Sequence, residues 1–393
     1  MEYVQERIAT LHDLTGTSVD GGQTGTGVGD ERLPTETDDL ERCVGETAIV
    51  VPMTDRECES PAAERVLSEL EALAPAAVYV PVRAAPGRIE PFREWLESFS
   101  LPMCVLWCGA PGVDNLLAEA GLAGEYGKGR DVWLALGPAA AAAETVVVHD
   151  ADARSYEADH VRRLLAPLAM DAGFEFSKGY YARVERNRLF GRLFRLFYEP
   201  LVETLATVHD EPILEYLSSF RYALAGEFAA SADLTRRLQA PRSWGLEVGT
   251  LGNAFDHAGF AGTAQVDLGR HVHDHRVVAG ETGLEGMSRT VAAELLRVVE
   301  QRGVEPTYDS LPRRYLETGE RLLAQYRADA AFNGLEYDLE SERGQLERYA
   351  DSISPPGPDR RLPPWTDAPF EPADVLEAAR PWQDGRVETG SVD

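Results

Sequence analysis

Hydrophobic and polar positions along the first half of the chain follow the pattern of an α/β protein. Apolar runs begin at residues 47 ("TAIVVPM"), 77 ("AVYVPV"), 103 ("MCVLWCG") and 145 ("TVVVHDADA"). Between them lie segments with helical periodicity, at 60–73, 88–99, 112–121 and 130–143. Strands that are apolar on both faces predict a mostly parallel sheet with helices covering both sides. Because the carboxyl ends of such strands share one edge, we expect ligands to bind there.

The second half of the chain has a less regular pattern. It predicts strands at 174–181 and 263–274, and helices at 156–169, 191–206, 211–219, 244–258 and from 280 to about 350. We expect an amphipathic helix over residues 1–14, then a flexible Gly/Thr-rich loop, and an extended Pro-rich tail at the other end. The predicted parts are an N-terminal helix and loop (1–46), a catalytic α/β domain (47–278), a helical region (279–350) and a tail (351–393).

Composition narrows the class of protein. The 393 residues are 44% hydrophobic, enough for a core, and no apolar run is long enough for a membrane helix, so we expect a cytoplasmic protein. A net charge of −28 disfavours nucleic acid and anionic membranes as partners. Among 38 basic residues only Lys128 and Lys178 are lysines. This balance is typical of a salt-adapted, haloarchaeal type of chain, with a GC-rich genome as the alternative.

Two acidic residues, Asp150 and Asp152, follow the apolar run that starts at 145. Alternation along a strand would place both carboxylates on one face, at the ligand-binding edge of the sheet. Paired carboxylates are costly without a cation, and their oxygens suit Mg²⁺ or Mn²⁺. Such pairs hold the metal that bridges the donor pyrophosphate in many nucleotide-sugar enzymes. Ordinary acidic residues in an exposed turn are the alternative in so acidic a chain.

Three histidines alternate in "QVDLGRHVHDHR", at His271, His273 and His275. On a strand they would share one face with Asp267. Because neutral imidazole is a common metal ligand, we expect one of them to bind metal and the others to lie near the substrate. A solvent-facing stripe is the alternative, and a three-histidine zinc site is disfavoured because nothing else resembles a zinc constellation.

Two further motifs place a charge near a helix start. In "YGKGRDVW", Lys128 lies between two glycines, where the backbone, the helix N-terminus and the ammonium group would together favour binding of an anion. The same argument applies more weakly to Lys178 in "FSKGYY". In "WGLEVGT", Glu247 could act on a sugar hydroxyl or an acceptor. An ordinary turn and a helix-dipole partner are the respective alternatives.

Taken in order, these motifs resemble the retaining GT-A glycosyltransferase family of glucosyl-3-phosphoglycerate synthase, with its mannosyl-3-phosphoglycerate synthase-like relatives, over about residues 47–300. "VPMTDRE" is similar to the family's turn after the first strand, and "GKGRDVW" to its Gly-Lys-Gly helix start. "ALAGEFA" is similar to its Gly-Glu-aromatic segment. The resemblance implies a GT-A fold with a helical C-terminal extension. It also implies donor contacts by Pro52, Asp55, Glu57, Lys128 and Asp150.

The same resemblance implies roles for the metal and acceptor residues. "VVVHDADA" and "AQVDLGRHVH" are similar to the family's metal-binding segments, which implies that Asp152 and His273 bind the metal. Glu247 corresponds to the acidic active-site residue, and Asp150 and Asp152 join it as catalytic candidates. The implied acceptor-binding residues are Gly191, Arg192, His271, His275 and Arg276.

Departures from the family pattern affect both substrates. The Ser/Asp-rich segment that helps to hold the nucleotide is replaced by "PVRAAPGR", which starts at residue 81. A Thr that contacts the acceptor phosphate is Phe194, and the Arg and Asn beside the metal histidine are His271 and His275. Donor base and acceptor identity are therefore weaker expectations than the type of reaction.

The resemblance implies a metal-dependent retaining hexosyltransferase. Glucose would pass from a nucleotide diphosphate sugar, such as UDP-glucose, to 3-phosphoglycerate or a similar small glycerate, for compatible-solute synthesis. The helical C-terminal third is a plausible homodimer surface. The alternatives are a sugar-phosphate nucleotidylyltransferase, although "VPMTDRECES" is acidic rather than basic, and a degenerate protein that only binds a nucleotide sugar.

Overall fold

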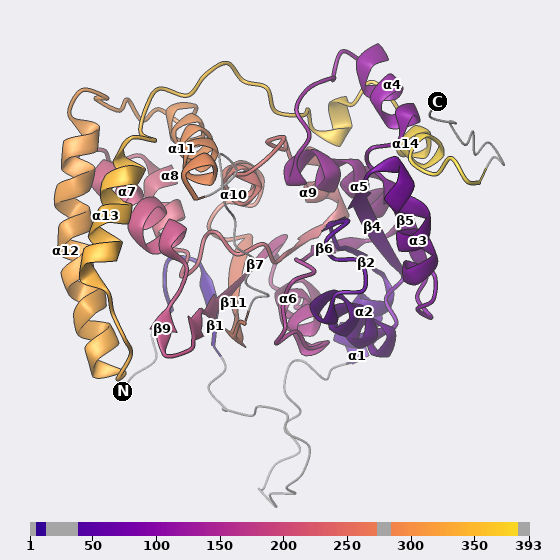
Figure 1. The fold of residues 1–393 in the computed structure, drawn as a ribbon, viewed down its shortest axis with the longest axis horizontal. Helices are drawn as coiled ribbons and strands as arrows, with labels where there is room; N and C mark the ends of the chain where they lie inside the picture. Colours follow the sequence, from indigo (N-terminus) through magenta and orange to yellow (C-terminus); the bar gives the residue numbers. More distant parts are fainter. Residues whose placement is uncertain (1–4, 13–37, 273–283, 384–393) are drawn as a thin grey trace, which may run out of the picture.

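A nine-stranded mixed sheet forms the centre of the molecule (Figure 1). The computed structural model describes residues 5–12, 38–272 and 284–383. The strand order is β1-β11-β7-β10-β6-β2-β4-β3, and β5 pairs with β4. The strands are β1 (Ala9–Leu11), β2 (Thr47–Val50), β3 (Met53–Thr54), β4 (Ala77–Arg83), β5 (Met103–Trp107), β6 (Thr145–Val148), β7 (Phe176–Ala182), β10 (Phe228–Ser231) and β11 (Thr263–Arg270).

All strand pairs in this sheet are parallel except those of β10, which runs antiparallel to both β6 and β7. The apolar runs at 47, 77, 103 and 145 form β2, β4, β5 and β6, as the pattern predicted. β10 was not expected, because its sequence "FAAS" is too short and too poor in β-branched residues to stand out. The prediction of an α/β fold with a mostly parallel sheet is confirmed.

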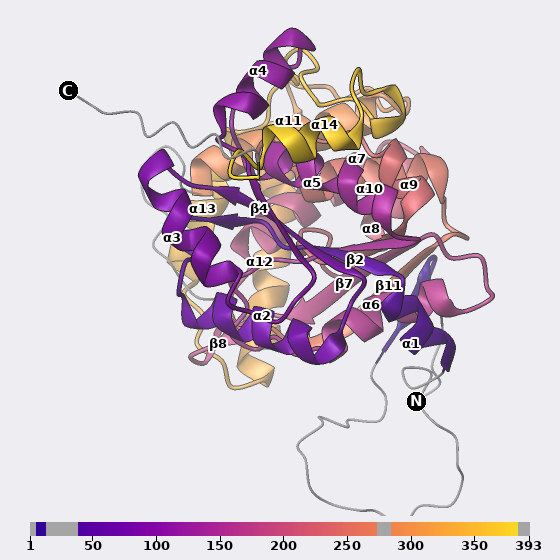
Figure 2. The same ribbon diagram turned by 90° about the vertical axis from the view of Figure 1, so that its right-hand side faces the viewer.

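Helices cover both faces of the sheet. α5 contacts β2, β4 and β6, whereas α6 contacts β7, β10 and β11, and Figure 2 shows these two helices on opposite sides. α5 is enclosed, with every residue from Gly129 to Ala140 buried. The helices of this half are α1 (Asp38–Gly45), α2 (Pro61–Leu73), α3 (Pro86–Leu96), α4 (Pro111–Glu119), α5 (Lys128–Ala142), α6 (Asp159–Ala169) and α9 (Ala232–Arg237).

A second group of helices packs at the far end of the sheet from α3 and α4 (Figure 1). It contains the π-helical turn η2 (Phe194–Tyr198), α7 (Glu199–Ala206), α8 (Pro212–Ser218), α10 (Leu246–His257), α11 (Leu284–Glu300), α12 (Leu311–Phe332) and α13 (Leu339–Ala350). α12 packs on α7, α13 and η2. Across the described ranges no helix is both long and apolar enough to cross a membrane.

Two sequence-based expectations about element boundaries are wrong. Residues 9–11, expected within a helix over 1–14, form β1, which pairs in parallel with 264–266 of β11. Backbone pairing at the open edge of the sheet outweighs the local helical pattern there. β11 ends at Arg270 after an irregularity at Asp267, so His271 follows the strand and the expected strand face with Asp267 is not formed. His273 and His275 lie outside the described residues.

The Pro-rich tail is only partly the irregular surface segment that was expected. It contains a 3₁₀ turn, η3 (Trp365–Asp367), and the helix α14 (Pro372–Ala378), which packs on α4 and α5. The Trp365 ring stacks on Trp133 of α5 with centroids 4.6 Å apart. The Trp365 indole N–H donates to the Trp133 carbonyl, and the Trp133 indole N–H donates to the Pro363 carbonyl, both at 2.8 Å. The tail therefore packs on α5 through Pro363, Trp365 and α14, and we call this contact the clasp.

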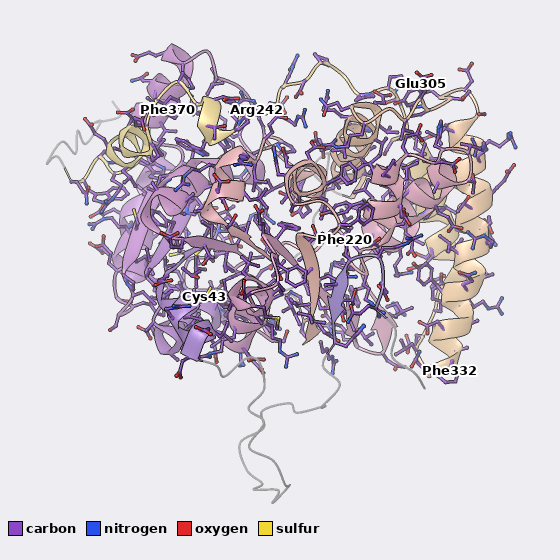
Figure 3. All side chains as sticks on the ribbon, turned by 180° about the vertical axis from the view of Figure 1, so that it is seen from behind. Cys43, Phe220, Arg242, Glu305, Phe332 and Phe370 are labelled. Carbon is purple, nitrogen blue, oxygen red and sulfur yellow. The ribbon has the colours of Figure 1, made fainter. Side chains whose placement is uncertain are left out.

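Replacement of the tail tryptophan tests this clasp. Trp365→Ala removes a ring that is 8% exposed, so we expect the free energy of unfolding to fall by about 3–5 kcal/mol. Denaturant unfolding measures the change. Phe332→Ala is the matched control, because Phe332 is 91% exposed at the end of α12 (Figure 3) and its loss should change stability little. Equal effects of the two variants would contradict a clasping role for the tail.

Candidate active site

The site is built where α5 begins, and Lys128 is its first residue. Gly127 is the N-cap, and Gly129 follows the lysine. A Cβ on Gly129 would lie 1.7 Å from the Pro241 carbonyl oxygen, which no side chain can tolerate. The glycines of this motif therefore let the loop before α10 approach the start of α5, in addition to any role toward a ligand. That close approach brings α10 beside Lys128.

Lys128 joins two elements through its ammonium group. Its Nζ lies 2.7 Å from Asp150 Oδ1, in the loop after β6, and 3.1 Å from Glu247 Oε1, in the first turn of α10. Burial opposes the ammonium charge, but Asp150 and Glu247 outweigh it and raise the pKa of Lys128 above its usual range. Burial also opposes the Glu247 carboxylate, yet Lys128 and Lys178 lower its pKa. The structure thus brings together three residues that were singled out from the sequence.

The other lysine of the chain lies in the same cluster. Lys178 in β7 is 1% exposed and interacts electrostatically with Glu247, Glu227, Lys128 and Asp150. Glu227, at the start of the "GEF" segment before β10, was not named as a site residue from the sequence, although its motif was quoted. The rarity of lysine was the signal that located this cluster, because both exceptions to the arginine preference converge on it.

Asp152 is half-buried in the same loop as Asp150, just beyond β6. The segment that precedes His273 is held against this loop: Arg154 N donates to the Val272 carbonyl at 2.8 Å, and Val272 N donates to Ser155 Oγ at 3.0 Å. His273 itself is outside the described residues, so its distance from Asp152 stays a prediction. The Asp152 carboxylate supplies the kind of oxygen ligand that Mg²⁺ and Mn²⁺ prefer. Within the described ranges, no three or more His, Cys, Asp or Glu side chains form a metal-binding group.

The residues on either side of β3 include the three remaining donor-side candidates, Pro52 before the strand and Asp55 and Glu57 after it. The Glu57 carboxylate accepts hydrogen bonds from Thr54 N at 2.7 Å and Thr54 Oγ1 at 2.6 Å, so in this structure it closes the turn. Asp55 lines a hollow of about 700 Å³ together with Arg56, Cys58 and Arg88. Arg88 belongs to the segment that departs from the family pattern, so that segment lies beside the turn. Pro52 is half-buried between β2 and β3.

Aromatic side chains connect the acceptor-side candidates. His271 stacks on Tyr181 with ring centroids 4.1 Å apart, and Tyr181 packs on Tyr222 at 5.1 Å. Tyr222 in turn packs on Phe194 at 5.0 Å, and its hydroxyl lies 3.0 Å from where a Cβ on Gly191 would be. The structure thus groups Gly191 with His271.

A guanidinium that the sequence did not single out also reaches this aromatic group. Arg183 Nη1 donates to the Tyr222 hydroxyl at 3.3 Å. Tyr222 and Arg183 gave no signal in the sequence, because the contacts depend on how β7 meets the loop before η2. Arg192 is half-buried in that loop, and His275 and Arg276 lie outside the described residues.

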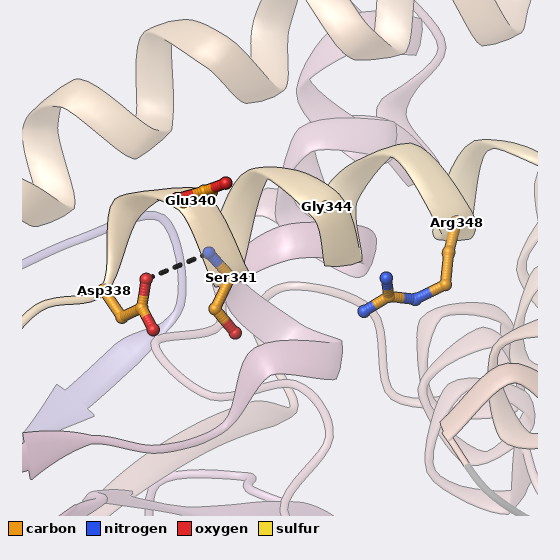
Figure 4. A pocket seen from close by; sticks show the side chains of 5 residues that line it. All are labelled: Asp338, Glu340, Ser341, Gly344 and Arg348. Carbon is orange, nitrogen blue, oxygen red and sulfur yellow. Dashed lines mark hydrogen bonds between the residues drawn. The ribbon is translucent and has the colours of Figure 1, made fainter.

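A second hollow, of about 340 Å³, runs along α13 (Figure 4). It is lined by Asp338, Glu340, Ser341, Gly344 and Arg348. Asp338 caps the helix by accepting a hydrogen bond from Ser341 N at 3.0 Å. None of these residues belongs to the lysine–carboxylate cluster, so this hollow does not compete with it as the candidate active site.

The sequence was compared with protein-family models and with the sequences of curated proteins. No protein-family model matches it. Glucosyl-3-phosphoglycerate synthase of Methanococcoides burtonii is 31% identical over 401 residues, which cover 96% of each chain. The enzyme of the same name from Persephonella marina is 33% identical over 323 residues, covering 78% of this chain and 79% of the relative.

Solved structures agree on the fold. Glucosyl-3-phosphoglycerate synthase from Mycobacterium tuberculosis, in complex with Mn²⁺, UDP-glucose and phosphoglyceric acid, matches with a TM-score of 0.54 at 24% identity, covering 76% of this chain and 89% of that one. The same enzyme with Mg²⁺ and UDP matches with a TM-score of 0.53. Together with the sequence relatives, this GT-A likeness confirms the resemblance drawn from the motifs. The chain belongs to the glucosyl-3-phosphoglycerate synthase family.

Proposed function

We propose that this chain transfers glucose from UDP-glucose to 3-phosphoglycerate, with retention of anomeric configuration. The observation that carries the proposal is the Lys128 ammonium between Asp150 and Glu247, at the edge of the sheet where parallel strands end. The relatives' names and the ligands of the Mycobacterium tuberculosis enzyme support the choice of substrates. The homodimer, the cytoplasmic location and the salt-adapted character remain predictions.

The donor diphosphate is the group whose charge the site must stabilise as the sugar leaves. A divalent cation held by Asp152 and His273 would supply part of that stabilisation as a Lewis acid. Lys128 supplies a fixed positive charge from α5, and its contact with Asp150 keeps it in place without further reorganisation. Glu247, on the other side of Lys128, orients the sugar or the acceptor as a carboxylate.

The acceptor would lie beside the aromatic group of His271, Tyr181 and Tyr222. 3-Phosphoglycerate carries a carboxylate and a phosphate, so its site needs cations or backbone donors. Gly191 and Arg192 lie in the loop before η2, and His275 and Arg276 are the further candidates. Phe194, which replaces the family's Thr, is 8% exposed and packs on Tyr222 and Tyr198, so here it supports the loop.

The purified chain in molar KCl provides the direct test of this function. We expect transfer from UDP-glucose to 3-phosphoglycerate with Mg²⁺ or Mn²⁺, and less or none from GDP-mannose or to glycerate and glycerol. Product formation followed by chromatography measures it, and a chelator should abolish it. Pyrophosphate-dependent formation of UTP would support a nucleotidylyltransferase instead. Tight UDP binding without transfer to any acceptor would support a protein that only binds the nucleotide sugar.

The metal assignment predicts strong effects of two substitutions. Asp152→Ala and His273→Ala should each lower kcat by at least about 100-fold and weaken Mn²⁺-dependent UDP binding, because each removes a ligand of the cation. Steady-state kinetics and calorimetry measure the two effects. Asp171→Ala, at an exposed position, is the matched control and should leave both unchanged. Wild-type activity in either ligand variant would overturn the assignment.

The substitution Gly226→Ala, which adds one methyl group, tests the geometry around Asp150. A Cβ on Gly226 would lie 2.6 Å from Asp150 Oδ2, so Gly226→Ala must displace the carboxylate that contacts Lys128. We expect kcat/KM for UDP-glucose to fall at least about tenfold, since a misplaced charge stabilises the leaving group less well. Gly45→Ala, at the exposed end of α1, is the control, because nothing lies within 4 Å of its Cβ position. Equal activity of the two variants would argue against a role for this contact.

A further inference from the structure

Both lysines of this chain are enclosed in one cluster, although they lie in different elements. The other 36 of the 38 Lys and Arg positions are all arginine, so an ammonium group has a use here that a guanidinium does not serve. Lysine carries a compact point charge on a flexible stem, whereas arginine needs room for a planar fork of donors. Lys128 already has a role in the proposed function, and Lys178 does not.

Lys178 anchors the turn that precedes β10. It stands opposite Phe228 in the pairing of β7 with β10, and its Nζ donates a hydrogen bond to the Ala225 carbonyl. One residue along β7, Gly179 N donates to the Glu227 carbonyl at 3.0 Å. Between these two attachments lies Gly226, the residue packed against Asp150. The turn Ala225–Glu227 is therefore fixed from β7 on one side and touches the donor-side carboxylate on the other.

Charge balance gives Lys178 a second function. The cluster holds three carboxylates, those of Asp150, Glu227 and Glu247, against the two ammonium groups. Burial lowers the pKa of Lys178 below its usual range, and Glu247 and Glu227 oppose that shift. Lys178 is also, after Lys128, a charge that lowers the pKa of Glu247. Without it, the carboxylates would lose one of the two ammonium groups that interact with Glu247.

We propose that Lys178 is a positioning residue for glucosyl transfer, whose buried ammonium fixes the turn Ala225–Glu227 and holds Glu247 as a carboxylate beside Lys128. The inference rests on the proposed function and deepens it. With a side chain only 1% exposed, Lys178 acts through these neighbours rather than by contacting the donor. Its removal should therefore affect catalysis more than donor binding.

Lys178→Met, which keeps an unbranched side chain only one heavy atom shorter and removes its charge, is the main variant. Among the residues that the structure describes, the charged groups that act on Glu247 are Lys128 from α5 and Lys178 from β7. Asp150 and Glu227 also interact electrostatically with Lys178. Loss of one positive charge raises the pKa of a carboxylate, by about one unit or more at a buried site. We therefore expect the Glu247 carboxyl group to titrate at higher pH in Lys178→Met than in the wild type. ¹³C NMR measures this titration, and the Glu247→Gln variant identifies the Glu247 signal. The acid limb of the kcat profile should move to higher pH in parallel.

Two further variants separate positioning from simple support of the fold. Ser177→Ala, the neighbour whose side chain points to the other face of β7, should match the wild type in every measurement. Lys178→Arg should restore the Glu247 titration more fully than kcat, because it returns the charge but not the compact shape. In Lys178→Met, kcat should fall about 100-fold while the Kd for UDP with Mn²⁺ stays within about threefold.

The measurements distinguish a positioning role of Lys178 from a purely structural role and from failure of the proposed function. Unchanged Glu247 titration together with unchanged kcat in Lys178→Met would overturn the inference. Joint loss of kcat, UDP affinity and melting temperature, with Glu247 titrating as in the wild type, would also overturn it, because it shows only a structural role. A wild-type chain that transfers no glucose would refute the proposed function, and the NMR titration, which needs no reaction, would still decide the part played by Lys178.

Discussion

The Lys128 ammonium between two carboxylates from separate elements is the contact on which the site depends. Asp150 follows β6 and Glu247 begins α10, so one side chain joins the two ends of the site. Burying either carboxylate without a partner would cost several kcal/mol, and neutralisation would be the alternative. The close approach permitted by Gly129 brings the loop before α10 to the start of α5, where this contact is made. Backbone packing and electrostatics are thus two parts of one arrangement.

The sequence predicted the central sheet well because fully buried strands leave an unambiguous apolar signature. β2, β4, β5 and β6 are such strands. The resemblance to a known family, carried by their motifs, also implied that Lys128, Asp150 and Glu247 belong to one site, and the structure brings the three together. β1, β10 and α14 were missed because each is short and is stabilised by partners distant in the chain, which local periodicity does not register.

The acceptor side shows the limit of motif reasoning more clearly. Phe194 was noted as a departure, but its packing on Tyr222, and that of Tyr181 on His271, depends on how β7 meets the loop before η2. Aromatic residues of this kind carry no spacing signature, so only the folded chain groups them. Lys178 is the intermediate case: composition marked it as unusual, and the structure shows that it is buried and hydrogen-bonded to the Ala225 carbonyl.

The clasp of the tail on α5 has a consequence for biosynthesis. The Trp365 indole donates to the Trp133 carbonyl and the Trp133 indole donates to the Pro363 carbonyl, so each hydrogen bond joins residues at least 230 positions apart. β1 likewise pairs with a strand more than 250 residues further on. A ribosome releases the chain from its N-terminus, so the helix that begins with Lys128 emerges long before its cover does. The nascent protein therefore cannot cover α5 until residues 363–378 have been translated.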